Sequence, residues 1–130
     1  MSTFHAVVWL DHTTAHVLQF DPAHVENQTV KARSQHARAH ANASHGHKSE
    51  REYYDHVAQA LDGVQEVLVV GPGQARTEFV AHCQAHRKDL AARIVGTESA
   101  DHPTDNQLVA LARRYFEKYD RMAGTPSPMA

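Results

Sequence analysis

Residues 67–79 read Val-Leu-Val-Val-Gly-Pro-Gly-Gln-Ala-Arg-Thr-Glu-Phe, which predicts a strand, a sharp turn and a helix in direct succession. The strand, Glu66 to Val70, is a continuous apolar run of the kind that is covered on both faces of a sheet. The turn is Gly71-Pro72-Gly73. Residues 74–86 then have the apolar spacing of a helix, with Ala75, Phe79, Val80 and Cys83 on one side. This unit is typical of an α/β fold.

Three predicted strands precede this unit. Residues 6–10 are apolar, β-branched and aromatic, and residues 15–20 alternate around Val17 and Leu18. The polar link between them is short, so we expect an antiparallel hairpin. Residues 25–32 form a more polar third strand, which we expect at a sheet edge.

Two further helices and a short strand complete the pattern. Ser49 with Glu52, and Thr104 with Gln107, have the spacing of a capping box, which predicts helices that end at Gly63 and Gly124. A strand is expected over residues 92–95, stopped by Gly96. The order β-β-β-α-β-α-β-α predicts a three-stranded antiparallel meander plus two parallel strands, with helices on the faces of the mixed sheet. This is the ribonuclease-H-like α/β architecture.

The length of 130 residues fits a single domain, which we expect over residues 1–124, followed by a disordered tail at 125–130. No apolar run approaches the roughly 20 residues of a membrane-spanning helix. The N-terminus lacks the pattern of a secretory signal, and the single Cys83 cannot form an internal disulfide. These features predict a soluble cytoplasmic protein with no membrane partner.

Positive charge is concentrated in one segment. Residues 31–51 contain five basic residues and one acidic residue, a net charge of +4, whereas the remaining residues carry 8 basic and 14 acidic groups, a net charge of −6. Four of the 12 histidines also fall in this segment. Within it, residues 34–48 have little apolar periodicity, which predicts a long mobile loop. Such a segment is typical of a solvated loop or of a surface that binds phosphate groups.

Three stretches, residues 6–20, 67–79 and 94–98, resemble the middle domain of eukaryotic and archaeal peptide-chain release factors and of their Pelota-type relatives. Small bacterial stand-alone versions of this domain are grouped with translational machinery components, which the chain resembles. The resemblance implies the fold described above and a connection with the ribosome or RNA. In the release factors, the loop between the third strand and the first helix carries Gly-Gly-Gln and enters the peptidyl-transferase centre. Residues 44–49 read Ser-His-Gly-His-Lys-Ser here, so the resemblance does not extend to the hydrolytic step.

These observations favour a non-catalytic, translation-associated protein that binds the ribosome or RNA through the basic loop. Lys and Arg side chains on phosphates would give affinity without sequence specificity, and histidines would add charge as the pH falls. The residues expected to contact RNA are Arg33, Arg38, Lys48 and Arg51, with His45 and His47.

Metal binding is one alternative. Imidazole suits zinc and nickel, and His40, His45 and His47 lie in the same predicted loop. His82 and His86 are four residues apart on a predicted helix, a second possible chelating pair. An exposed polar face explains this second pair more simply.

A metal-dependent nuclease is a further alternative, because the predicted fold supports such chemistry in other proteins. Two-metal catalysis needs several carboxylates at one point. Asp11 follows the first strand, but its possible partners have no spacing that forces convergence; these are Glu52, Asp55, Asp101 and Asp105. We therefore expect Asp11 to be a turn residue that binds nearby backbone amides.

Overall fold

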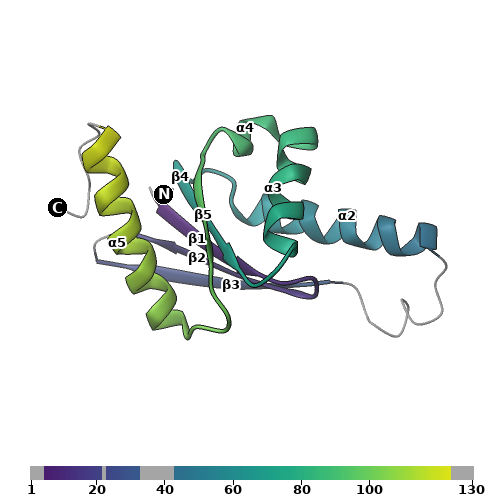
Figure 1. The fold of residues 1–130 in the computed structure, drawn as a ribbon, viewed down its shortest axis with the longest axis horizontal. Helices are drawn as coiled ribbons and strands as arrows, with labels where there is room; N and C mark the ends of the chain where they lie inside the picture. The colour runs from purple at the N-terminus through teal and green to yellow at the C-terminus, as the bar shows by residue number, and fades with distance from the viewer. Residues whose placement is uncertain (1–4, 22, 33–42, 124–130) are drawn as a thin grey trace.

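The computed structural model describes residues 5–21, 23–32 and 43–123, with residues 43–49 and residue 123 described through their backbone alone. Its strands are β1 (His5–Leu10), β2 (Thr14–Phe20), β3 (Val25–Lys31), β4 (Glu66–Gly71) and β5 (Ile94–Ser99). Its helices are α2 (Ala43–Ala60), α3 (Ala75–His86), α4 (Lys88–Ala91) and α5 (Asp105–Ala123). Figure 1 shows α5 on one side of the sheet and α2 with α3 on the other.

The five strands form one mixed sheet in the order β3-β2-β1-β4-β5. β1, β2 and β3 pair as an antiparallel meander, and β4 and β5 continue the sheet parallel to β1. The predicted α/β class and element order are confirmed, with the short helix α4 as an addition. β3 is the outermost strand on one side of the sheet, as its polar sequence indicates.

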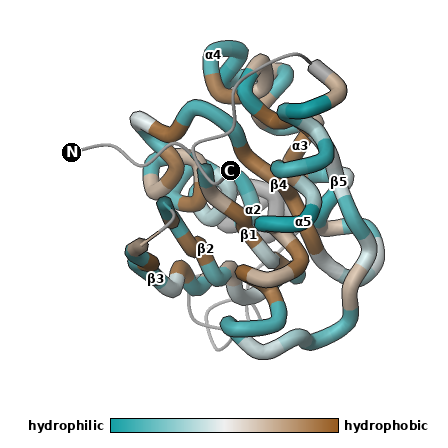
Figure 2. Tube along the Cα trace, turned by 90° about the vertical axis from the view of Figure 1, so that its left-hand side faces the viewer, coloured by the Kyte–Doolittle hydropathy of each residue, from teal (hydrophilic) through white to brown (hydrophobic). Residues whose placement is uncertain are grey.

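Alternation along the strands divides the apolar residues between two cores. Ala6, Val8 and Leu10 of β1 face α2 and α3, whereas Val7 and Trp9 face α5. Because helices cover both faces of the sheet, β1 and β4 are buried along their whole length. Figure 2 shows the most hydrophobic segments along β1 and β4, in the interior of the molecule.

Helix α2 begins at Ala43, six residues before the predicted start at Ser49. The prediction of a loop over residues 34–48 is therefore wrong for residues 43–48, and the rest of that loop lies outside the described residues. Apolar periodicity detects only a helical face that packs against a core. Figure 1 shows the first turns of α2 extending past the end of α3, which is why the sequence gives no such signal.

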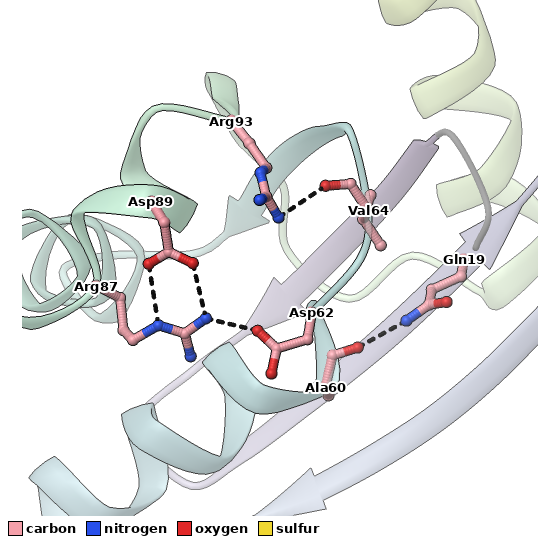
Figure 3. Close-up of polar contacts among 7 residues, drawn as sticks. All are labelled: Gln19, Ala60, Asp62, Val64, Arg87, Asp89 and Arg93. Atoms are coloured by element: carbon pink, nitrogen blue, oxygen red, sulfur yellow. Dashed lines mark hydrogen bonds and ion pairs between the residues drawn. The ribbon is translucent and has the colours of Figure 1, made fainter.

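Polar contacts hold the other end of α2 in place (Figure 3). The side-chain amide of Gln19 in β2 donates to the Ala60 carbonyl at 2.6 Å. After the helix, Asp62 accepts from the Arg87 guanidinium at 2.5 Å, and Arg87 also donates twice to Asp89 at 3.2 Å. These contacts raise the pKa of Arg87. α2 is thus anchored at its C-terminal end and projects at its N-terminal end.

The end of the chain differs from prediction in one strand. β5 runs through Gly96 to Ser99, so glycine does not stop it. A Cβ at Gly96 would lie 1.8 Å from the Tyr115 hydroxyl, which donates to the Val95 carbonyl at 3.2 Å. The glycine therefore makes room for α5 against β5. In the described ranges, no helix is both long and apolar enough to cross a membrane.

Candidate functional site

The carboxyl ends of the parallel strands β1, β4 and β5 lie at one edge of the sheet. β3 ends at this edge as well, because it runs antiparallel to β2. The helices that lead into or out of these strands, α2, α3 and α5, begin there. Ligands of open α/β sheets bind outside the carboxyl ends of the strands. We call this edge the carboxyl edge and treat it as the candidate site.

Two glycines shape the carboxyl edge where β4 meets α3. A Cβ at Gly71 would lie 2.2 Å from the backbone oxygen of Leu10 in the neighbouring β1, so no other residue fits without moving backbone. Gly73 has a φ of 66°, which disfavours any residue with a side chain. The close approach of β4 to β1 explains Gly71, and the sharp turn predicted from the sequence explains Gly73.

Asp11, directly after β1, is a turn residue, as predicted. Its Oδ1 accepts from the backbone amides of Thr13 and Thr14, both at 2.8 Å, and from the Thr13 hydroxyl at 3.1 Å. Burial acts to raise the pKa of the Asp11 carboxyl, but the amide donors outweigh burial and lower it. The carboxylate is therefore committed to closing the β1–β2 hairpin.

The carboxylates proposed as nuclease partners of Asp11 do not gather around it. Asp55 contacts His82 instead, and Asp105 is the first residue of α5. Within the described ranges, two groups of side chains could together hold a metal ion, and neither includes Asp11, Glu52, Asp101 or Asp105. The geometry gives no support to a nuclease site centred on Asp11.

One of these groups, His12, Glu50 and Glu78, lies at the carboxyl edge. His12 Nε2 is 3.3 Å from Glu78 Oε1, and the two side chains are 49% and 40% exposed. The Tyr54 hydroxyl donates to the same oxygen at 3.1 Å, and burial together with Glu78 raises the pKa of Tyr54. Sequence reasoning did not single out Glu50 or Glu78. The three residues come from a hairpin and two helices, and no sequence spacing links them.

On the α5 side of the carboxyl edge, Trp9 lies between two histidines. Its ring centroid is 5.8 Å from that of His16 and 5.0 Å from that of His102. The indole N–H donates to the Asp101 carbonyl at 2.9 Å, which ties the end of β1 to the start of the α5 segment. These three rings line a small pocket of about 140 Å³.

The structure places only part of the predicted RNA-binding set. Arg33 and Arg38 lie outside the described residues, as does His40 of the predicted metal set. His45, His47 and Lys48 belong to the first turns of α2 rather than to a loop. Arg51 is exposed on the same helix, and Lys31, the last residue of β3, is exposed at the same edge.

The metal prediction for His40, His45 and His47 stays a prediction. Positions two apart, such as 45 and 47, lie on different sides of a helix axis. The other candidate pair does not form an exposed polar face: His82 is buried, and its Nε2 lies 2.8 Å from Asp55 Oδ1. Cys83 is fully buried, as expected, and burial raises the pKa of its thiol to about 12.

Comparison with solved structures finds this fold in Pelota proteins and in an archaeal translation termination factor. Pelota of Thermoplasma acidophilum matches with a TM-score of 0.60 and 19% identity, over 85% of this chain and 32% of that one. Pelota of Archaeoglobus fulgidus matches with a TM-score of 0.64 and 13% identity, over 95% and 36%. An archaeal translation termination factor, aRF1, matches with a TM-score of 0.59 and 16% identity, over 92% and 39%.

The predicted resemblance to release factors and Pelota is thus confirmed at the level of the fold. S. cerevisiae Dom34, described as a translation termination-like factor, has it too, with a TM-score of 0.59, 11% identity, and 89% and 34% covered. The chain spans about a third of the length of each of these structures. Comparisons with models of protein families and with curated proteins give no match.

Proposed function

We propose that this protein associates with the ribosome, and that it binds RNA phosphates through residues 31–51 without carrying out hydrolysis. The observation that carries the proposal is the coincidence of charge and position. The segment with a net charge of +4 begins at Lys31, the end of β3 at the carboxyl edge, and ends in the first turns of α2, in a fold shared with Pelota and aRF1.

The arrangement suits contact with a polyanion for two physical reasons. The start of α2 carries the positive end of the helix dipole, which adds to the charge of the Lys and Arg residues of the same segment. The first turns of α2 also extend past α3, so they can reach a surface that the rest of the domain does not touch (Figure 1). Contacts to phosphates do not depend on the identity of the nucleobases. We therefore expect the protein to bind RNA without sequence preference.

The remaining chain has a net charge of −6, which orients the molecule on an RNA surface. Acidic groups are repelled by phosphates, so the basic segment is the part that approaches. The sequence has no Gly-Gly-Gln, and residues 44–49 hold histidines and a lysine where the resemblance would place that motif. Binding without peptidyl-tRNA hydrolysis follows.

The test is cosedimentation with ribosomes over a range of salt concentrations. The wild type is compared with a variant in which Arg33, Arg38, Lys48 and Arg51 are changed to Ala. Each phosphate contact on single-stranded nucleic acid contributes about 0.7 to the slope of log affinity against log salt. If all four of these basic side chains contact phosphates, the magnitude of the slope should be smaller by about 2.8 in the variant, and the variant should bind far more weakly at low salt.

The matched control removes the same charge elsewhere. Lys88, Arg114, Lys118 and Arg121 are exposed on α4 and α5, and changing all four to Ala lowers the net charge equally. We expect this control to retain most of the wild-type binding. Equal loss in both variants, or binding by the wild type that does not depend on salt, would contradict the proposal.

A further inference from the structure

At the opposite edge of the sheet, three side chains that can bind a metal meet in the interior. His5 is the first residue of β1 and Glu66 the first residue of β4, and the two are directly paired in the parallel register. Both face the α5 side of the sheet. Asp120, near the C-terminal end of α5, completes the group. Glu66 is 61 positions and Asp120 is 115 positions from His5 along the chain, and the fold brings all three side chains together.

The geometry of this group is tight. His5 Nε2 lies 3.1 Å from Glu66 Oε1 and 3.1 Å from Asp120 Oδ2. The side chains of His5 and Asp120 are fully buried, and that of Glu66 is 12% exposed. The Phe116 ring packs against the imidazole, with centroids 4.2 Å apart. Glu66 therefore provides the one route from solvent within the group.

Two carboxylates, those of Glu66 and Asp120, meet the imidazole of His5 in this group. Among the described residues, no Lys or Arg forms an ion pair with Glu66 or Asp120. The second oxygen of Asp120, Oδ1, is buried without a hydrogen-bond partner. Asp120 also lies in the last turn of α5, where the helix dipole disfavours an anion and favours a cation. Buried carboxylates without compensation are strongly unfavourable.

We propose that His5, Glu66 and Asp120 bind one divalent transition-metal ion, with zinc as the fitting representative. An imidazole with two carboxylates is a ligand set that zinc accepts, at about 2.0–2.2 Å from each atom. Two ligands at that distance from a tetrahedral ion are about 3.3 Å apart, close to the 3.1 Å contacts here. A divalent ion would neutralise both carboxylates, and Asp120 Oδ1 or a water could fill the fourth position.

The position of the site gives the ion a structural role. It would join the beginning of the chain, β1, to the neighbouring β4 and to the last helix. Metal binding to a site that forms only in the folded state stabilises that state. The site lies at the edge of the sheet opposite the carboxyl edge, so the proposal is independent of RNA binding.

The test is calorimetric titration of the metal-stripped full chain with zinc. Histidines elsewhere would confuse the result, so the reference protein carries His12, His40, His45 and His47 changed to Ala. We expect it to bind one equivalent of zinc and to melt at a higher temperature when zinc is present. D120N in this reference should weaken zinc binding by at least about tenfold, since changes even beyond the direct ligands have that effect.

A second variant and a spectroscopic measurement guard against misfolding of D120N. E66Q keeps the shape of the side chain at the less buried position and should also weaken binding. In the unmodified wild-type protein, zinc should shift the ¹⁵N resonance of His5 Nε2. No bound equivalent in the reference protein, zinc affinity unchanged in both variants, or an unmoved His5 resonance would overturn the proposal. A proton shared by the two carboxylates would then be the remaining account of the cluster.

Discussion

Asp11 illustrates how a single residue can be recognised from its local surroundings. Its partners, Thr13 and Thr14, are two and three positions away, so the sequence contains the whole interaction. His82 is the opposite case. Its partner Asp55 is 27 residues away on another helix, and a histidine beside an apolar helix face gives no sign of whether it is buried. The sequence therefore predicts Asp11 correctly and His82 wrongly.

We predict that D11A lowers the free energy of unfolding by about 1–2 kcal/mol near neutral pH, because two backbone amides lose their acceptor. The folded state lowers the pKa of Asp11 below its ordinary value of 3.8, so this contribution is present above that pH. It is lost as the pH falls through the lowered value. Urea denaturation at pH 7 and pH 3 measures both effects.

D101A removes the same charge from an exposed position and should change stability by no more than about 0.5 kcal/mol. A D11A effect that is as large at pH 3 as at pH 7 would show that the charged carboxylate is not what closes the turn.

At the scale of elements, two sequences with the spacing of a capping box adopt different structures. Thr104 and Gln107 form the predicted capping box: the Thr104 amide donates to Gln107 Oε1 at 2.9 Å, and the Gln107 amide donates to Thr104 Oγ1 at 3.1 Å. Ser49 and Glu52 have the same spacing but lie inside α2. The Asp-His-Pro sequence before Thr104 prevents helix, whereas nothing before Ser49 does so.

Packing between distant elements also limits what the sequence predicts about a helix. Helical spacing in the sequence predicts an apolar stripe on α5 made of Leu108, Leu111, Ala112, Tyr115 and Tyr119. The structure confirms Leu108 and Ala112 as buried and adds Phe116, which is fully buried. Phe116 lies four positions after Ala112, so the spacing allowed it. Which of several apolar neighbours points to the core depends on the sheet beneath, with Phe20 6.1 Å away between ring centroids.

We predict that F116A lowers the free energy of unfolding by about 3–5 kcal/mol, because it leaves a cavity between α5 and the sheet. M122A lies on the same helix, and Met122 is 78% exposed, so its effect should stay within about 0.5 kcal/mol. Urea denaturation of both variants checks this. Comparable stability of F116A and M122A would mean that α5 does not close the second core.

At the scale of the whole molecule, the two edges of the sheet have different characters. The carboxyl edge receives the starts of α2, α3 and α5 and the ends of the basic segment, and its His12 and Glu78 side chains are accessible to solvent. The opposite edge holds the buried group His5, Glu66 and Asp120. The charge asymmetry was visible in the sequence. The convergence of three distant residues required the strand register and the course of α5, which local patterns do not contain.

The most direct measurement of the central claim places a photoactivatable crosslinking residue at position 51, on α2, or at position 88, on α4, and irradiates each protein bound to purified ribosomes. Position 51 is the last residue of the basic segment, and position 88 is exposed on a separate helix. We predict crosslinks to ribosomal RNA from position 51 that disappear at high salt, and few from position 88. Equal crosslinking from both positions, or none from position 51, would contradict the claim that this protein meets RNA through the start of α2.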